Sequence, residues 1–536
     1  MTSEPVAKIS TAWDTGPETA AAVGRTRRSY DETPYRSAPL KRSHPARLAA
    51  NARFLGLEAP AVAHARILEI GCASGGHLIP LAASFPEARF LGVDLSPVQI
   101  ADGQARIDRL GLENIALAAR SLTELGPADG QFDYIICHGV YSWIPDALRD
   151  DLLRICKALL SPTGVAMISY NVLPGWRLFQ IARDCMQLHA GAEETHAARS
   201  AQTRRMFELL ASFSSEKYSY GQFWRKEAKK MTVGDDAYLA HEIFEDSNAP
   251  CTFRDFTARA GRHGLAYLSE TWLAANVAET VAFEATAIID ELSGDDPYAR
   301  EQYVDIFSGR SFRESLLVHA ERSPSVDRSL SSARIEDLHL IAPMNLAVTT
   351  AEGRPGEWTI ADGGGGIVSN DFDVVAAIHR LIERRPSSSR LEDIAPANAT
   401  SPELRAAVAA TLAEMLKFGH LQISTEAVAC AKSLSTRPKA WSLAASDARD
   451  SDFTATLRHA AFQMAPLQRF LLLLLDGTRT RDDLVAIVVE EALNGNMRVA
   501  GPDGPIEGRE RLTAFLGPRV DECIAVFARV GLLVDG

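Results

Sequence analysis

Six small residues follow an apolar segment near the start of the chain: Gly71, Cys72, Ala73, Ser74, Gly75 and Gly76. Small residues at the beginning of a helix leave backbone N–H groups uncovered, so a ligand can approach the main chain closely. Asp94 ends a second apolar segment roughly twenty residues later, where a carboxylate can accept both hydroxyl groups of a ribose. This spacing predicts a binding site for a ligand that contains a ribose.

The order of residues in this turn is Glu69-x-Gly71-x-Ala73-x-Gly75. A dinucleotide-binding fold would have GxGxxG here, so the glycine spacing argues against a Rossmann oxidoreductase. An acid two positions before the first glycine, with small residues at every second position after it, resembles motif I of the class I S-adenosylmethionine-dependent methyltransferases. Their cofactor has no pyrophosphate, which agrees with this spacing. A strand, turn and helix with a purely structural role would show a similar bare pattern.

Two later segments are rich in aromatic residues, HGVYSWIP at 138–145 and SYNVLPGW at 169–176. The side chains in them that could act on a substrate are His138, Tyr141, Trp143, Tyr170, Asn171 and Trp176. A single aromatic residue at the end of a sheet is commonly part of the core. Several aromatic residues in two adjacent loops, together with a histidine and an asparagine, favour a substrate pocket instead.

Strand and helix patterns alternate from Arg66 onward, which predicts a parallel sheet with crossover helices. The expected strands cover residues 66–70, 89–93, 114–118, 132–137, 165–170, 266–269 and 311–318. Ligands bind such sheets outside the carboxyl ends of the strands, where Gly71, Asp94, Ser121, His138 and Tyr170 fall. The predicted fold class is α/β. With the resemblance, it is a doubly wound, Rossmann-like class I methyltransferase sheet with a helical insertion, followed by mainly helical, winged-helix-like C-terminal domains.

Changes in composition divide the chain into four predicted parts. Residues 1–44 form an N-terminal tail and arm, and the tail is expected to be flexible up to about residue 24. Residues 45–325 form the methyltransferase domain, in which a charged helical insertion at about 185–260 overhangs the substrate side as a lid or a dimer interface. Residues 326–435 and 436–536 each show the order of helices and terminal strand of a winged-helix-like unit, which suggests an internal duplication.

The composition is that of a globular protein and argues against nucleic acid as a partner. Of the 536 residues, 46% are hydrophobic and 23% are charged, and the formal net charge is -13. Phosphate binding relies on a basic face, and neither winged-helix-like segment has a basic recognition helix, so docking of a partner or substrate is favoured over DNA binding. The cysteines show no metal-ligand spacing, and no apolar stretch reaches the length of a membrane span. We expect a cytoplasmic protein without a metal site.

Further segments resemble one particular family within the class I methyltransferases. ILEIGCASGGHLIPLA, DLSPVQI, FDYIICHGVYSWIP and SYNVLPGW look like the bacterial methyltransferases that carry a methyltransferase regulatory domain. Characterised members of that family are the rickettsial outer-membrane-protein lysine methyltransferases. Residues 238–270 resemble the regulatory segment of the family, and residues 309–321 resemble the strand that follows it. The similar segments together cover most of residues 28–345.

This resemblance implies S-adenosyl-L-methionine as the cofactor. The predicted cofactor-binding residues are Tyr30, Tyr35, Glu69, Gly71, Cys72, Ala73, Gly75, Asp94, Leu95, Ser121, Leu122 and His138. Glu69 and the small residues would line the methionine end, Asp94 would hold the ribose, and residues 138–143 would face the methyl group. The family often has an acid near the adenine where this chain has Ser121, so the Ser121 hydroxyl or the Leu122 backbone would contact the adenine. The two tyrosines either fold over the cofactor or only attach the arm to the domain.

The predicted reaction is methyl transfer to lysine side chains of a protein substrate. In-line displacement at a sulfonium requires alignment and the exclusion of water, without a metal or a covalent intermediate. Lysine must attack as the neutral amine, and its deprotonation at pH 7 costs about 4.6 kcal/mol from the reference pKa. A dry aromatic pocket lowers that pKa by desolvation, while the ring faces attract the ammonium and the sulfonium. His138 would accept the proton or would have only a structural role.

Two other functions stay open. A small-molecule O- or N-methyltransferase could use His138 as the base, although the large C-terminal modules favour a protein substrate. A cofactor-binding scaffold without turnover is the third reading, and the intact Glu69, Gly71 and Asp94 argue against it. A homodimer is also compatible with the sequence.

Overall fold

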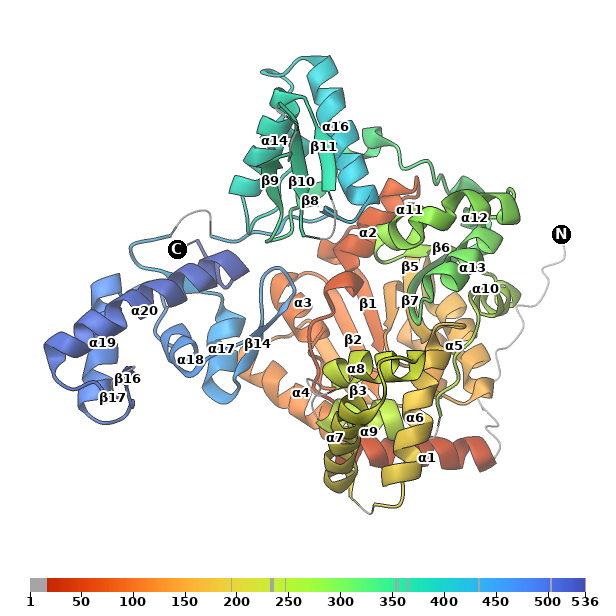
Figure 1. Cartoon of the computed structure of the whole chain (residues 1–536), viewed down its shortest axis with the longest axis horizontal. Helices are drawn as coiled ribbons and strands as arrows, with labels where there is room; N and C mark the ends of the chain where they lie inside the picture. Colours follow the sequence, from red (N-terminus) through yellow and green to blue (C-terminus); the bar gives the residue numbers. More distant parts are fainter. Residues whose placement is uncertain are drawn as a thin grey trace.

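The computed structural model describes residues 17–193, 195–231, 236–245, 247–351, 354, 356–363, 366–431, 434–501 and 504–535. A seven-stranded sheet lies at its centre, with the strand order β3-β2-β1-β4-β5-β7-β6 (Figure 1). The strands are β1 Arg66–Ile70, β2 Arg89–Asp94, β3 Ile115–Ala119, β4 Phe132–Cys137, β5 Leu160–Asn171, β6 Leu265–Glu270 and β7 Phe312–His319. β1 to β5 pair in parallel, and β7 is antiparallel to both of its neighbours. The predicted doubly wound α/β sheet is confirmed.

The strand order reverses between β1 and β4, which places a crevice at their carboxyl ends. These two strands are buried apart from Arg66 and Asp133, and Leu68 faces Ile135 in their register. Helix α4 (Pro97–Leu110) follows β2 and begins as the sequence predicts, because the Ser96 hydroxyl accepts the N–H of Gln99 and proline occupies the first helical position. Apolar strands in a parallel sheet thus bring the predicted turn and acids to one edge.

Further helices cover the two faces of the sheet. They are α2 Pro45–Phe54, α3 Leu78–Ser84, α5 Asp146–Leu159 and α10 Phe253–Arg262. Three more helices lie between β6 and β7: α11 Ala278–Val281, α12 Thr286–Ser293 and α13 Pro297–Ser308. No helix within the described ranges is long and apolar enough to cross a lipid bilayer.

The N-terminal segment corrects one expectation. The predicted flexible tail extends to about residue 24, but helix α1 (Pro17–Glu32) begins inside it. Pro17 suits the first turn of a helix and the alanines that follow have the highest helix propensity, so this composition supports a helix once the end of α1 is anchored. The anchor is Ser29, whose hydroxyl donates to Glu245 at 2.6 Å. Residues 1–16 of the predicted tail lie outside the described residues.

The helical insertion forms a small unit of its own above the sheet edge. It consists of α6 Trp176–Ala190, α7 His196–Phe213, α8 Ser219–Met231 and α9 Asp236–Phe244, which lie beside α1 in Figure 1. Its core gathers around Trp224 and Phe207, whose rings meet edge to face at 5.6 Å. The insertion therefore begins earlier than the predicted residue 185, and α10, which the sequence places within it, packs against β6.

Two smaller units follow the sheet. The first contains β8 His339–Ile341, β9 Ala347–Thr350, β10 Trp358–Ala361, β11 Gly366–Ser369, α14 Phe372–Glu383, α15 Leu391–Ile394, α16 Pro402–Lys417 and β12 Gln422–Ser424. The second contains β13 Lys439–Ala440, α17 Ser442–Asp450, β14 Phe453–Ala455, β15 Ala461–Gln463, α18 Pro466–Leu472, α19 Arg481–Leu493, β16 Ala500–Gly501, β17 Gly504–Pro505, α20 Arg509–Val530 and β18 Leu533–Val534.

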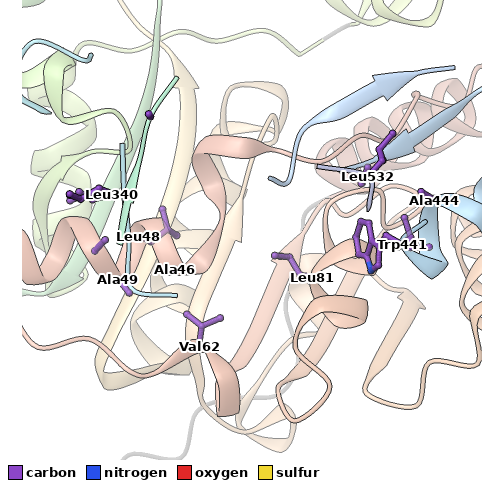
Figure 2. Close-up of a cluster of buried hydrophobic side chains, with 14 of the residues drawn as sticks. Ala46, Leu48, Ala49, Val62, Leu81, Leu340, Trp441, Ala444 and Leu532 are labelled. Carbon is purple, nitrogen blue, oxygen red and sulfur yellow. The ribbon is translucent and has the colours of Figure 1, made fainter. Parts of the chain in front are cut away.

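One apolar core continues from the sheet domain into both C-terminal units. Figure 2 shows Leu48 of α2 near Leu340 of β8, and Leu81 of α3 on the side of Trp441 and Leu532. A bidentate ion pair adds to this packing, because the Arg106 guanidinium on α4 donates to both carboxylate oxygens of Asp447 at 2.9 and 2.7 Å. The C-terminal units are thus packed against the sheet domain rather than tethered to it.

Candidate active site

A cavity of about 880 Å³ opens at the carboxyl ends of the strands. Sites for small molecules commonly have volumes of ~300–1,000 Å³. The predicted site residues that line it are Tyr30, Tyr35, Glu69, Gly71, Cys72, Ala73, Asp94, Leu95, Ser121, Leu122, His138, Trp143, Asn171 and Trp176. The structure therefore brings together the arm, the ends of β1 to β5 and the start of the insertion around one space.

The turn after β1 corrects the expectation of uncovered amides. The N–H groups of Gly71 and Cys72 donate to the carbonyl of Val93 at 2.8 and 3.1 Å, and that of Gly75 donates to the carbonyl of Cys72. Ala73 N–H donates to Asp94 Oδ2 at 2.8 Å. The backbone of the turn is thus largely occupied by the protein itself, because the turn is closed against the end of β2. It offers no open cradle for a phosphate, in keeping with a ligand that has none.

The glycines of this turn serve close packing. Gly71 has φ +80°, and a Cβ there would lie 2.4 Å from Val140 Cγ2. A Cβ at Gly76 would lie 2.4 Å from the backbone carbon of Ser37, whose hydroxyl accepts the Gly76 N–H at 2.7 Å. Gly76 therefore lets the N-terminal arm lie directly on the turn.

Two acids face the cavity from adjacent strands, the buried Glu69 and the half-buried Asp94. Asp94 accepts the N–H groups of Ala73 and Ser96 at 2.8 and 2.9 Å, and burial raises its pKa although these bonds work against the rise. Glu69 is 3% exposed, and its Oε2 has no hydrogen-bond partner among the described residues. Burial, with a smaller effect of Asp94, raises the pKa of Glu69 to about 8. An unpaired buried carboxyl at a cavity wall is suited to a cationic group of a ligand.

The tyrosines of the arm attach it to the insertion, and a contact of their rings with the cofactor stays a prediction. Tyr30 stacks on His241 of the insertion at 4.2 Å, and Tyr35 lies 5.9 Å from the same ring. Both tyrosines also line the cavity. Ser96 at the start of α4 donates to Asp31 at 2.6 Å. The arm is therefore attached to the insertion and to α4, and it closes one side of the cavity.

The loops after β4 and β5 place two polar groups at the cavity wall. His138 Nε2 lies 3.7 Å from Glu314 Oε1, and burial lowers the pKa of His138 while Glu314 works against the change. A histidine that is neutral near pH 7 can accept a proton. Asn171 is 3% exposed, and its Nδ2 has no partner in the described part of the chain. Asn171 is held through its backbone, since its N–H donates to Ser142 Oγ at 2.8 Å.

Two tryptophans form an aromatic part of the wall. Trp176 donates its Nε1–H to Asn248 at 3.0 Å and lies against Phe179 at 4.8 Å. Trp143 lies under the guanidinium of Arg183, which is 5.7 Å from the ring centre. Asn248 and Phe179 thus hold the Trp176 ring in place, and Arg183 of the insertion covers the Trp143 ring.

Three predicted site residues do not line the cavity. Tyr141 and Tyr170 are each 1% exposed and pack on Phe256, with ring centres 5.2 and 4.0 Å away. Their rings lie beneath the wall, because α10 covers this face of the sheet. Gly75 is turned toward Leu117 and Ile79, and a Cβ there would lie 3.0 Å from Leu117. The prediction that the two tyrosines wall the pocket is wrong.

The predicted adenine contact involves a residue that also shapes the local turn. The Ser121 hydroxyl accepts the N–H of Thr123 at 3.3 Å, and the Ser121 N–H donates to Glu124 at 2.7 Å. Ser121 and Leu122 both line the cavity. An adenine contact at these residues stays a prediction.

Sequence reasoning missed many residues that line the cavity, among them Gln99, Glu242, Arg36 and Phe453. Gln99 is 2% exposed, and neither its Oε1 nor its Nε2 has a hydrogen-bond partner among the described residues. Its place in the first turn of α4, five residues after Asp94, was a usable signal. Glu242 of α9, Arg36 of the arm and Phe453 of β14 also line the cavity. No local pattern links these to the motif, because long-range packing brings them there.

Comparisons with known proteins agree with this geometry. The description "Methyltransferase domain" matches residues 67–164, "Predicted methyltransferase regulatory domain" matches residues 235–319, and "PKMT, C-terminal winged helix domain" matches residues 436–532. The uncharacterised protein RP028 of Rickettsia prowazekii (strain Madrid E) is 36% identical over 233 residues, which are 43% of this chain and 93% of that protein. The uncharacterised protein RP789 of the same organism is 37% identical over 317 residues, which are 58% of this chain and only 56% of that protein.

A solved structure has the same architecture over nearly the whole length. PKMT2 from Rickettsia typhi, in complex with AdoHcy, superposes with a TM-score of 0.83 at 25% identity, covering 94% of this chain and 100% of that one. The winged-helix fold of the C-terminal domain is confirmed by these matches. The chain therefore belongs to the class I S-adenosylmethionine-dependent methyltransferases that carry a methyltransferase regulatory domain.

Proposed function

We propose that this chain transfers methyl groups from S-adenosyl-L-methionine to lysine side chains of a protein substrate. The observation that carries the proposal is the single cavity that joins the acids at Glu69 and Asp94 to the aromatic wall at Trp143 and Trp176. The likeness to PKMT2 and to the PKMT winged-helix domain supports a protein substrate. An acceptor on a macromolecule also accounts for large C-terminal units packed next to the cavity.

The residues at the cavity fit the cofactor. Asp94 has acceptor capacity left for ribose hydroxyls, and the unpaired Glu69 carboxyl suits the α-ammonium group of the methionine part. S-adenosyl-L-methionine supplies a methyl group on a sulfonium, which is already activated for displacement. The protein's own task is then to orient the acceptor, exclude water and remove a proton.

The acceptor side of the cavity suits an amine. Indole faces attract a cation and also desolvate it, which lowers the pKa of an ammonium. His138 is kept neutral by burial and lies at the cavity wall, so we assign it the proton from the attacking amine. Asn171, with an amide that has no partner in the described structure, would orient the acceptor.

Transfer of label from methyl-labelled S-adenosyl-L-methionine into a lysate of the source cell tests this proposal. We expect labelled protein bands that acid hydrolysis resolves as methyl-lysine. The Trp143→Ala variant should lose about fivefold to thirtyfold in transfer, because removal of a cation–π wall costs about 1–2 kcal/mol. Label only in the small-molecule fraction would contradict the protein substrate. Binding of the cofactor without any transfer would favour the scaffold reading.

The raised pKa of Glu69 predicts that protons are released when the ligand binds. Because its pKa is raised to about 8 by burial, its carboxyl is mostly neutral at pH 7 and must ionise to pair with an ammonium. Binding of S-adenosylhomocysteine at pH 7 should therefore release about one proton, since the bound state holds fewer protons than the free protein. Titration calorimetry in two buffers of different ionisation enthalpy measures this release. Glu69→Gln should abolish it and weaken binding, and an unchanged release would contradict the assignment.

A homodimer and a cytoplasmic location are further parts of the proposal. Leu188 and Phe213 of the insertion are 89% and 83% exposed, which supports burial of this surface in a second copy. Sedimentation equilibrium of the wild type and of Phe213→Glu tests the dimer, and fractionation of the source cell tests the location. A monomer at micromolar concentration would contradict the first.

A further inference from the structure

We infer that Glu242 recognises the ammonium group of the acceptor amine and so selects a positively charged side chain. This inference rests on the proposed function and adds to it a specificity-determining residue on the insertion. Glu242 lies on α9 and lines the cavity.

One oxygen of the Glu242 carboxyl lacks a hydrogen-bond partner in the described part of the chain. Its Oε2 is buried and forms no hydrogen bond with any described residue. Arg183 is the cation that acts most strongly on the pKa of this carboxyl, but its guanidinium donates to the backbone carbonyls of Glu242 and Glu245. Burial raises the pKa of Glu242 to about 7, against the effects of Arg183 and His241. A buried carboxyl in this condition destabilises the fold unless a ligand pairs with it.

The surroundings of Glu242 match an ammonium ligand. Arg183 places Glu242 next to the Trp143 ring, because the same guanidinium contacts both residues. Tyr238, one helical turn before Glu242, and Trp176 also line the cavity. A carboxylate among aromatic faces attracts a cation through both its charge and the ring quadrupoles.

Different charged groups act on Glu69 and on Glu242, although the Tyr30 ring is close enough for both Asp94 and Glu242 to act on its pKa. Asp94 at the ribose position acts on the pKa of Glu69, whereas Arg183 and His241 of the insertion act on that of Glu242. Glu69 comes from β1 beside the cofactor turn, and Glu242 comes from the wall that carries Trp143 and Trp176. Two unpaired carboxyls then correspond to two cations, one on the cofactor and one on the acceptor.

The test compares two acceptor analogues that differ only in charge. N-acetyl-lysine amide and N-acetyl-norleucine amide are titrated by saturation-transfer NMR into the full chain, which is saturated with S-adenosylhomocysteine. We expect the wild type to bind the lysine analogue about tenfold or more tightly than the norleucine analogue, as for a hydrogen bond to a charged group. Glu242→Gln should bring this ratio close to one, while its affinity for S-adenosylhomocysteine changes less than about twofold.

Two control variants keep the test specific. Asp184→Asn alters an exposed acid on α6 that does not line the cavity, and it should keep the wild-type ratio. Glu69→Gln should weaken the binding of S-adenosylhomocysteine and still keep the wild-type ratio of affinities for the two analogues. Glu242→Gln removes an unpaired buried charge, so its unfolding temperature should not fall. If the unfolding temperature of Glu242→Gln does fall, the same titrations are made with Glu242→Met.

Three results would overturn the inference. The first is a wild type that binds both analogues equally well, and the second is a Glu242→Gln variant that still prefers the lysine analogue. The third result is a Glu242→Gln variant whose affinity for S-adenosylhomocysteine falls as much as its affinity for the lysine analogue. Failure of the proposed function is a separate result. In that case the wild type would distinguish the analogues, but no protein in the lysate would be labelled.

Discussion

Replacement of Asp94 by alanine should weaken binding of S-adenosylhomocysteine by at least about 100-fold, because two hydrogen bonds to a charged acceptor are each worth about 1.5–3 kcal/mol. The variant also frees the N–H groups of Ala73 and Ser96, which now donate to the carboxylate. The turn after β1 would then lose one of its attachments to the end of β2 and keep the two bonds from Gly71 and Cys72 to the Val93 carbonyl. Titration calorimetry gives the dissociation constant directly.

An exposed acid on the helix that follows Asp94 is a control for the change in net charge. Asp102 lies exposed on α4 and does not line the cavity, so Asp102→Ala should bind S-adenosylhomocysteine as the wild type does. Asp94→Asn keeps the size of the side chain and should show most of the loss. If Asp94→Ala weakened binding by less than about fivefold, the ribose assignment to Asp94 would be wrong.

Loss of Arg313 should destabilise the sheet domain by about 3–5 kcal/mol, since it leaves buried carboxylates without their partner. Arg313 is 1% exposed on β7 and bonds Glu270, Glu301 and Asp305 at 2.7, 3.0 and 2.8 Å. These contacts connect β7 to β6 and to α13. We expect Arg313→Met, which keeps a long side chain, to show this loss in urea unfolding followed by far-ultraviolet circular dichroism.

The loss of unfolding free energy in Arg313→Met should become larger as the pH rises. Burial raises the pKa of Asp305 to about 6 against the effect of Arg313, whereas burial of Glu270 is outweighed by Arg313 and Arg310, which hold its pKa below its usual value. Without Arg313 the pKa of Asp305 rises further and that of Glu270 rises from its lowered value, so the folded variant binds more protons than its unfolded chain. Its stability must then fall as pH rises from 5 to 8. The exposed pair Arg254–Asp296 is the control, and Arg254→Met should cost less than about 1 kcal/mol.

The sheet and the cofactor half of the cavity were accessible from sequence because their signals are local. The apolar segments of β1 and β4 are short and almost fully buried, and Glu69, Gly71 and Asp94 lie at or just after the carboxyl ends of β1 and β2 by position alone. Ser96 and Pro97 correctly marked the start of α4. Residue type and spacing suffice when neighbouring strands bring their own ends together.

The rest of the cavity depends on packing that leaves no local signal. Tyr141 and Tyr170 have the composition of a pocket wall, but Phe256 covers them because α10 packs on that side of the sheet. The amides of the turn are paired because β2 ends beside it. Glu242 reaches the cavity only through the arrangement of α9 against α6. The helical spacing of the insertion predicts its helices but not the direction in which they face.

The C-terminal winged-helix unit contributes to the cavity directly. Phe453 lines it, the guanidinium of Arg36 lies 4.5 Å from the ring centre of Phe453, and Arg36 also donates to Asp452 at 3.3 Å. The arm thus has the cofactor turn on one side, through Ser37, and the winged-helix unit on the other. The units of this chain are therefore not interchangeable modules. A chimera that carries another C-terminal unit after residue 435 would lack part of the cavity wall. Sequence changes in this unit are therefore expected to accompany changes in the arm.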